Sequence, residues 1–376
     1  LSIAAKELIG VSACKLTGRV TDAAGNPGPE SSALTLSVNS GSDPEPVSIA
    51  IQDPDAALTN SDALTYRVTF TEKVKSVSED DFDLVDGTTA IDSNAFSAEA
   101  VTGSDNKIWD VTFTGGDIAS YNGTATLKFA ASPTITDVDN KALTEFDSLS
   151  ASYVLDNTAP AKATTAPTTT IGSSVNAAES AAGFDVAVTF AGTNAEVGDA
   201  VELLLAGASF ATPLTHTLTQ DDLDNGYTFS LPAGALGADT SGTNTKKITM
   251  RVVDQAGNNG TESDALALTK DTVAPDPLNT PTVDVDSGLG DGVSKSEYTD
   301  TDSVPTVTVS TGALGSGNVI QLLLADTVIA QTTLESVAGS HDFNVTGLLG
   351  ASDGSADGAK VLTARAVDAA GNQGVA

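Results

Sequence analysis

The sequence predicts an all-β protein made of tandem β-sandwich domains, and three observations lead to that prediction. Apolar and polar residues alternate along short segments such as ALTYRVTFTE (63–72) and FDVAVTFAG (184–192). Clusters of Gly, Asn and Asp separate these segments, and one turn string, D-x-A-G-N, recurs at long intervals. Alternation with a period of two places the apolar side chains on one face of a strand, which is typical of half-buried antiparallel sheets.

The number of strands per stretch of chain indicates the type of sandwich. About seven short strands separated by turns, in about 115 residues, favour an immunoglobulin-like sandwich. The segment KITMRVV (247–253) follows the same alternation and is expected to bury Ile248, Met250 and Val252. Helix-like fragments are short, as in LTQDDLDN (218–225).

The recurring turn string sets the domain organisation. It occurs as VTDAAGNPG (20–28), VVDQAGNNG (252–260) and AVDAAGNQG (366–374), and aligning the three places Arg19, Arg251 and Arg365 in register. The period is about 115 residues, with proline-bearing linkers near residues 44, 159 and 274. We therefore expect four repeats arranged end to end, the first a C-terminal remnant and the last without its final strand. Their boundaries are 1–44, 45–158, 159–273 and 274–376.

Composition excludes several classes of function. The chain of 376 residues carries 17 Lys and Arg against 50 Asp and Glu, a net charge of −33, so nucleic acid is not an expected partner. No apolar run approaches the length of a membrane span, so membrane insertion is not expected. Two histidines without shared ligand spacing disfavour zinc, and the chain shows no catalytic triad pattern and no phosphate-binding loop. The sequence therefore predicts a protein that is not an enzyme.

Acidic residues gather where neighbouring repeats are expected to meet. In a seven-stranded sandwich the D-x-A-G-N turn lies at the entry pole, beside the arriving linker, and the first interstrand loop lies at the exit pole. Uncompensated carboxylates would repel one another there, and Ca²⁺, which takes oxygen ligands in flexible geometry, would neutralise them. The candidate calcium ligands are Asp53, Asp55, Asp137, Asp139, Asp156, Glu179, Asp254, Asn258, Asp271, Asp284, Asp286, Asp291, Asp368 and Asn372.

These residues also have an interpretation without a metal. A tight turn needs a glycine that adopts positive φ, such as Gly257, and an Asp that caps its amides, such as Asp254. If calcium is present, Asp156 and Asp254 are expected to share an ion. The first joint is expected to be weaker, because Asn39 stands where the other linkers have Asp, and TDVDN (136–140) would partly replace its missing turn.

The order and spacing of these motifs resemble a known family. NAAES (176–180) before an alternating strand, TFTEKVKSVSEDDFDL (69–84), the D-x-A-G-N turns and the DNTAP linker (156–160) together resemble the Ig-like repeats of giant bacterial surface adhesins of the biofilm-associated and RTX types. The resemblance implies an extender region of a secreted fibre on the bacterial cell surface, in which calcium stiffens the joints and neighbouring repeats are the partners.

Two other functions remain open from the sequence. One is a repeat of a surface-layer or filament protein, in which like chains pack laterally. The other is a glycan- or protein-binding module that uses its pole loops, of which 131–150 is the best candidate. An aromatic cluster on a loop would favour binding, but Tyr121, Phe146 and Tyr227 are too scattered to predict one.

Overall fold

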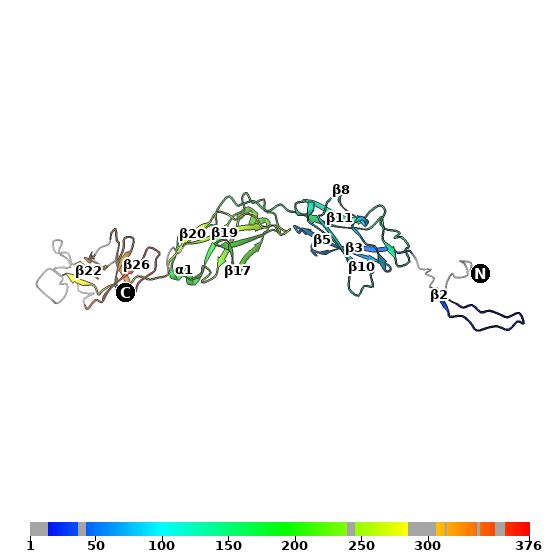
Figure 1. Cartoon of the computed structure of the whole chain (residues 1–376). Helices are drawn as coiled ribbons and strands as arrows, with labels where there is room; N and C mark the ends of the chain where they lie inside the picture. The colour runs from blue at the N-terminus through cyan, green and yellow to red at the C-terminus, as the bar shows by residue number, and fades with distance from the viewer. Residues whose placement is uncertain are drawn as a thin grey trace. The chain divides into compact units, whose positions relative to one another are not determined.

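The structure is a computed structural model that describes residues 14–36, 43–238, 245–284, 306–312, 314–336, 339–349 and 358–376. By its internal contacts the chain forms two compact units, Leu1–Thr158 with Gln255–Asn258, and Ala159–Asp254 with Asn259–Ala376. Strands make up nearly all of the regular structure (Figure 1), which confirms the predicted all-β fold of tandem sandwiches. Sandwiches 2, 3 and 4 are numbered here to match the predicted repeats.

The described part of the first unit begins with a two-stranded arm. In the arm, β1 (Cys14–Leu16) pairs antiparallel with β2 (Leu34–Leu36). An isolated bridge joins Thr21 to Pro27, on either side of the first D-x-A-G-N string. The arm therefore presents one such turn at the tip of a hairpin-like segment.

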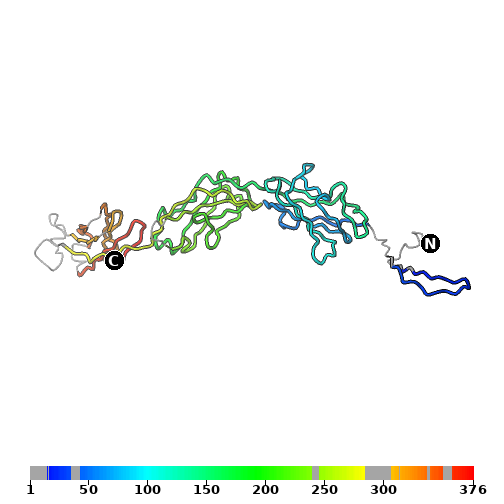
Figure 2. Tube along the Cα trace, viewed as in Figure 1, coloured from blue at the N-terminus to red at the C-terminus, as the bar shows by residue number. Residues whose placement is uncertain are grey.

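Sandwich 2 consists of two main sheets in the first unit. One contains, in spatial order, β3 (Pro46–Asp53), β5 (Ala63–Phe70), β10 (Ile108–Thr114) and β9 (Ala95–Ala100). The other contains β4 (Leu58–Thr59), β13 (Ser150–Leu155), β11 (Gly123–Phe129), β7 (Phe82–Asp86) and β8 (Thr89–Ala90). A small sheet pairs β12 (Thr136–Asp137) with β6 (Val74–Lys75), and the 3-10 turns η2 (Glu79–Asp81) and η3 (Gly116–Ala119) connect strands. Figure 2 follows the chain through these strands.

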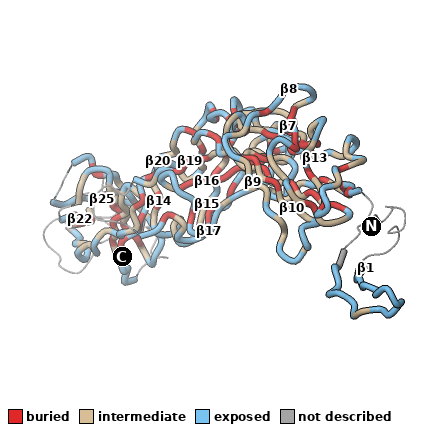
Figure 3. Tube along the Cα trace, turned by 45° about the vertical axis from the view of Figure 1, so that its right-hand side comes forward, coloured by how far each residue is buried: buried red, intermediate tan, exposed pale blue. Residues whose placement is uncertain are grey.

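The alternating pattern of β5 builds the core of sandwich 2. Leu64, Tyr66, Val68 and Phe70 are buried, while the residues between them are half-buried. The rings of Tyr66 and Tyr153 meet edge to face at 5.1 Å between centroids. Burial raises the pKa of the Tyr66 hydroxyl above its usual range, and that hydroxyl donates a hydrogen bond to the Ala125 carbonyl. Figure 3 shows that buried residues lie mainly along the strands and exposed residues mainly in the loops between them.

The second unit holds two further sandwiches. In sandwich 3, one sheet runs β14 (Ser174–Val175), β20 (Leu266–Lys270), β19 (Thr245–Val253), β16 (Ala200–Leu205) and β17 (Ala208–Thr217), and the other pairs β15 (Phe184–Val188) with β18 (Tyr227–Leu231). In sandwich 4, β21 (Thr282–Asp284), β22 (Thr306–Ser310) and β25 (Ser340–Asn344) face β24 (Thr327–Thr333), β23 (Val319–Leu324) and β26 (Leu362–Val367). Each has its own apolar core, and the core of sandwich 3 includes the predicted Ile248, Met250 and Val252.

Helices are minor elements of this fold. Helix α1 (Ala177–Ala182) follows β14, and α2 (Gln220–Asn225) lies within the segment that the sequence indicated as helix-like. Within the described ranges, no helix has the length and apolar character needed to cross a membrane.

Candidate functional site: the turns at the joints

The D-x-A-G-N turn is built around one carboxylate oxygen. Asp22 Oδ1 accepts the backbone N–H groups of Ala24 (2.9 Å) and Asn26 (2.8 Å), and Asp22 N–H donates to the Asn26 carbonyl. Asp368 Oδ1 likewise accepts from the N–H groups of Ala370 and Asn372, both at 2.9 Å. The Asn26 side chain contributes most to lowering the pKa of Asp22 below its usual value. The sequence prediction that the aspartate caps the turn's amides is confirmed at these two turns.

Residues 137–141 form the same turn from a different sequence. Asp137 Oδ1 accepts from the N–H groups of Asp139 and Lys141, both at 2.8 Å, and Asp137 N–H donates to the Lys141 carbonyl at 3.0 Å. Asn140 has a φ of 67°, in the position where Gly25 has 91° and Gly371 has 94°. TDVDN thus supplies the turn that sandwich 2 lacks by sequence, while metal binding there stays a prediction.

The fifth residue of the turn makes the contacts beyond it. The Asn372 side chain is buried, 4% exposed. Its Nδ2 donates to Asp368 Oδ2 (2.9 Å) and to the carbonyl of Asp271 in the linker (2.8 Å), and its Oδ1 accepts from Ala177 N–H at 2.7 Å. One amide therefore joins the turn of sandwich 4 to the linker and to the first residue of α1 in sandwich 3.

A second set of contacts, equivalent to those at Asn372, lies in the first unit. That unit includes Gln255–Asn258, the last four residues of another D-x-A-G-N turn. Asn258 Nδ2 donates to the Asp156 carbonyl (2.7 Å), and Asn258 Oδ1 accepts from Asn60 Nδ2 (3.0 Å). Asn60 follows β4 as Asn176 follows β14. Asp156 N–H bonds the Thr59 carbonyl, and Asp271 N–H bonds the Val175 carbonyl in the same way. These matching contacts show that the arrangement at Asn372 recurs in the molecule.

Lysine replaces this asparagine in the turn of sandwich 2. Lys141 Nζ lies 3.7 Å from Asp43 Oδ1, in the segment that precedes β3. Asp137 Oδ2 is buried and finds no hydrogen-bond partner among the residues that the structure describes. Asn26 Nδ2 and Asn372 Nδ2 supply that partner in the corresponding turns, at 3.0 and 2.9 Å. The substitution of Lys for Asn explains the unpaired oxygen.

The other candidate ligands are mostly exposed or bonded within the protein. Asp156 Oδ1 accepts from Thr158 N–H and Asp271 Oδ1 from Val273 N–H. Glu179 Oε2 accepts from Asn176 N–H and so caps α1. The exposed candidates are Asp53, Asp55 and Asp139, while Asp254 is half-buried. Asp284 ends β21, and Asp286 and Asp291 lie outside the described residues.

This arrangement tests whether the joints fit a calcium ion. Both carboxylate oxygens of Asp368 and the whole amide of Asn372 are engaged in hydrogen bonds. Calcium takes about 6–8 oxygen ligands. In the part of the chain that the structure describes, no group of three or more His, Cys, Asp and Glu side chains is placed to hold a metal ion. The side chains at the Asn372 joint, arranged in this way, do not fit a calcium cage.

Sandwich 3 carries a polar cluster that sequence analysis missed. His216 Nε2 lies 3.0 Å from Asp222 Oδ2, and its ring stacks on Tyr227 with centroids 3.7 Å apart. Hydrogen bonds from Thr219, aided by His216, lower the pKa of Asp222 to about 2. The spacing of Thr219 and Asp222, three residues apart before a short helix, is a capping signature that indicates part of this cluster. No sequence pattern placed His216 beside it.

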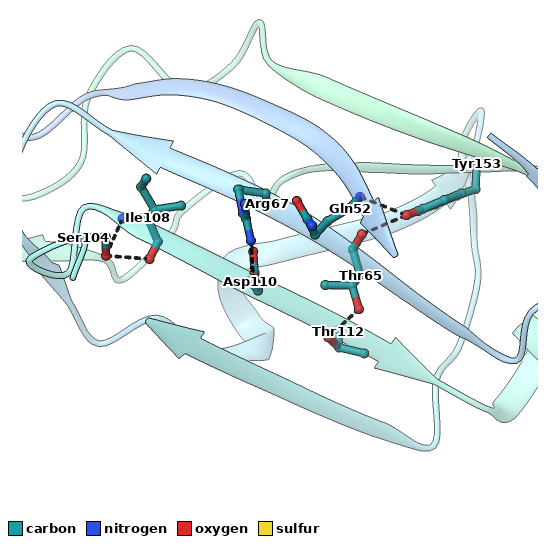
Figure 4. A network of polar contacts seen from close by, with 8 residues as sticks. All are labelled: Gln52, Thr65, Arg67, Ser104, Ile108, Asp110, Thr112 and Tyr153. Atoms are coloured by element: carbon teal, nitrogen blue, oxygen red, sulfur yellow. Dashed lines mark hydrogen bonds and ion pairs between the residues drawn. The ribbon is translucent and has the colours of Figure 1, made fainter. Parts of the chain in front are cut away.

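Cross-strand polar pairs join neighbouring strands of the sheets, as Figure 4 shows for sandwich 2. In sandwich 2, Arg67 makes a bidentate pair with Asp110 at 2.8 Å, and Thr65 bonds Thr112 at 2.8 Å. Arg251, aligned by the sequence repeat, bonds Glu202 at 2.7 Å. Arg365, its counterpart, bonds Gln321 instead. These pairs join neighbouring strands, which is a structural role.

The aromatic residues considered for ligand binding contact the protein itself. Phe146, on the loop 131–150, packs against Phe129 with centroids 6.0 Å apart. Tyr121 donates to Asp86, and Tyr227 stacks on His216. All three are therefore engaged in packing or hydrogen bonding.

Comparison with known proteins gives structural likeness only. No protein-family model matches the chain, and no curated protein is significantly similar to it. Among solved structures, a calcium-stabilised adhesin with which an Antarctic bacterium reaches out and binds ice is 22% identical, with 99% of this chain and 81% of that chain covered and a TM-score of 0.38. A structure concerning host cell surface retention of a 1.5-MDa bacterial ice-binding adhesin is 19% identical, with 86% and 93% covered and a TM-score of 0.33.

A third similar structure comes from another class of protein. The fibronectin(III)-like modules of Clostridium thermocellum CbhA are 12% identical, with 56% of this chain and 89% of that chain covered and a TM-score of 0.29. These TM-scores lie below 0.5, so the neighbours carry no functional conclusion for this chain.

The unpaired oxygen of Asp137 leads to a stability prediction. Lys141→Asn should supply the missing N–H donor and raise the free energy of unfolding of sandwich 2 by about 1 kcal/mol, the usual net value of a hydrogen bond. Denaturant titration followed by the fluorescence of Trp109, the single Trp of the chain, reports on this sandwich. Lys141→Ala, which removes the ammonium group without adding a donor, is the control. Equal stabilities of the two variants would contradict the prediction.

The lowered pKa of Asp222 predicts how sandwich 3 responds to acid. Because the folded-state pKa is lowered from 3.8 to about 2, this group's contribution is complete above 3.8 and is lost as the pH falls through about 2. Asp222→Asn should destabilise sandwich 3 at neutral pH and flatten its stability profile between those values. Amide resonances of sandwich 3, followed during denaturation at each pH, measure this. Asp224→Asn, at an exposed position of α2, should leave the profile unchanged. An Asp222→Asn profile parallel to that of the unmodified protein would refute it.

Proposed function

We propose that this chain is an extender segment of a secreted bacterial surface adhesin or fibre, in which tandem sandwiches hold a distal part away from the cell. The observation that carries the proposal is the buried Asn372 amide, which bonds both the linker carbonyl of Asp271 and the backbone N–H of Ala177 in sandwich 3. A spacer needs neighbouring domains to be fixed to each other, and this amide provides such a connection.

Energetics support a fixed joint at Asn372. A typical hydrogen bond contributes about 0.5–1.5 kcal/mol net, and leaving a buried polar group without a partner costs about 1–3 kcal/mol. Pulling sandwich 4 away from its linker would break the bonds of a buried amide at once. The short, proline-bearing linkers add to this, because few residues separate one strand from the next domain.

The net charge of the chain bears on whether like chains pack side by side. A net charge of −33 makes like chains repel one another, which favours a single fibre over uncompensated lateral packing.

The loop 131–150 was the candidate for a binding site. In this loop, the buried Leu143 and the half-buried Phe146 pack against the core of sandwich 2. No exposed aromatic platform for a sugar is formed there by the described residues, so we take no binding function as a second candidate.

The proposal includes a role for calcium at the joints. The sequence predicts that it stabilises the joints, and we assign it no ligand set, because the described side chains do not form one. When bound, the ion would neutralise carboxylates near the linkers, while the protein's own amides hold the turn and the linker together.

Solution scattering tests the extender proposal directly. We expect the full chain to give the scattering profile of an elongated particle, since linkers of about four residues with Pro do not let sandwiches fold back on each other. A variant in which a long Gly/Ser linker replaces residues 271–275 is the control and should be more compact on average. A profile typical of a compact globule for the unmodified chain would overturn the proposal.

Thermal unfolding tests the calcium part separately. Millimolar calcium should raise the melting midpoint relative to excess chelator, because an ion that binds only the folded joints stabilises them by mass action. Magnesium at equal ionic strength is the control for general charge screening. Superimposed melting curves in calcium and in chelator would remove calcium from the proposal and leave the hydrogen-bonded joint intact.

A further inference from the structure

We propose that the fifth residue of the turn decides what kind of joint a sandwich forms with the segment before it. Asparagine at this position locks the joint through hydrogen bonds that need no metal ion, whereas lysine makes a salt-dependent ion pair. The inference rests on the proposed role of the tandem joints and names the residue that determines their mechanical character. It concerns Asn372 in the second unit and Lys141 in the first.

The chemistry of the amide explains why asparagine can act as the lock. The joint offers Asn372 an acceptor, the Asp271 carbonyl, and a donor, the Ala177 N–H. A primary amide has two N–H donors and a carbonyl acceptor, so it satisfies both partners and still bonds Asp368 Oδ2. An aspartate lacks the donors and a lysine lacks the acceptor. Among these side chains only asparagine completes the set at this length.

The backbone around Asn372 is shaped for close docking. A Cβ on Gly371, which has a φ of 94°, would lie 3.2 Å from Asn176 Nδ2, and one on Gly374 would lie 2.9 Å from the Pro275 carbonyl oxygen. In the first turn, by contrast, a Cβ on Gly25 would meet no atom of the described residues within 4 Å. Among the described residues, the same turn is therefore docked in sandwich 4 and undocked in the arm.

The lysine joint depends on a different interaction. Lys141 Nζ and Asp43 Oδ1 are 3.7 Å apart, with side chains 32% and 54% exposed. Ion pairs this exposed contribute about 0–1 kcal/mol and are screened at high ionic strength. Lys141 cannot supply the carbonyl acceptor of an asparagine side chain, and no described residue pairs with Asp137 Oδ2. The joint at Asp43 is thus expected to loosen with salt, whereas the joint at Asn372 is not.

Site-resolved hydrogen exchange of the full chain tests the lock. Asn372→Ala should make the Ala177 amide exchange about tenfold faster, which corresponds to about 1.4 kcal/mol, while amides of the β22 and β23 core stay protected. Asn372→Asp should break the bond to the linker, because it places a carboxylate oxygen against the Asp271 carbonyl oxygen in place of an N–H donor. The matched control is Asn26→Ala, which removes the same side chain from an undocked turn and should leave Ala177 unchanged. Protection of Ala177 in the unmodified chain should persist in chelator.

The salt response of the two joints is the second readout. Spin-label distance distributions, in a Cys14→Ser background, should broaden with salt for a label pair on sandwich 2 and on the segment at Asp43. They should stay narrow for a pair on sandwiches 3 and 4 until Asn372 is replaced.

Three results would overturn the lock: unchanged exchange at Ala177 in Asn372→Ala, protection that disappears in chelator, or equal salt responses of the two joints. A compact particle in scattering with these exchange results intact would instead refute only the extender function.

Discussion

One carboxylate oxygen organises the joints of this protein. In each turn whose bonds are resolved, Asp Oδ1 accepts two backbone N–H groups, and the aspartate's own N–H closes the ring onto the fifth residue's carbonyl. Buried backbone groups left unpaired would be costly, so this capping makes a tight turn stable without a neighbouring strand. It also fixes the backbone of the fifth residue, and that residue's side chain then reaches the linker.

Much of the fold can be predicted from the sequence because it depends on interactions between residues close together in the chain. The alternation in β5 and β19 predicts which side chains are buried, since successive residues of a strand point to opposite faces. TDVDN could be recognised as a turn for a similar reason. Its first residue is the capping Asp137, and its fourth, Asn140, tolerates the positive φ that Gly371 adopts elsewhere.

The contacts of the candidate site could not be predicted in this way, because they are long-range. Asn372 meets Ala177 at a sequence separation of 195 and Asp271 at a separation of 101. A carboxylate that caps its own turn looks the same in a sequence as one that ligates an ion. Counting acidic residues at the joints therefore predicts a cation, while the structure shows Asp368 committed to backbone amides. His216 was missed for another reason: it lies only six residues before Asp222, but it belongs to β17 while Asp222 belongs to α2, and no sequence pattern relates the two elements.

The comparison of Asn372 with Lys141 shows what the neutral amide achieves in so acidic a chain. A joint held by carboxylates alone would repel itself, and a joint held by an exposed ion pair responds to salt. The asparagine adds no charge, pairs Asp368 Oδ2 and bonds the main chain of both neighbours. Lys141 gains an attraction to Asp43 but leaves Asp137 Oδ2 buried without a partner in the described part of the chain. The two turns have the same backbone hydrogen bonds, so the difference between these joints follows from the side chain of the fifth residue.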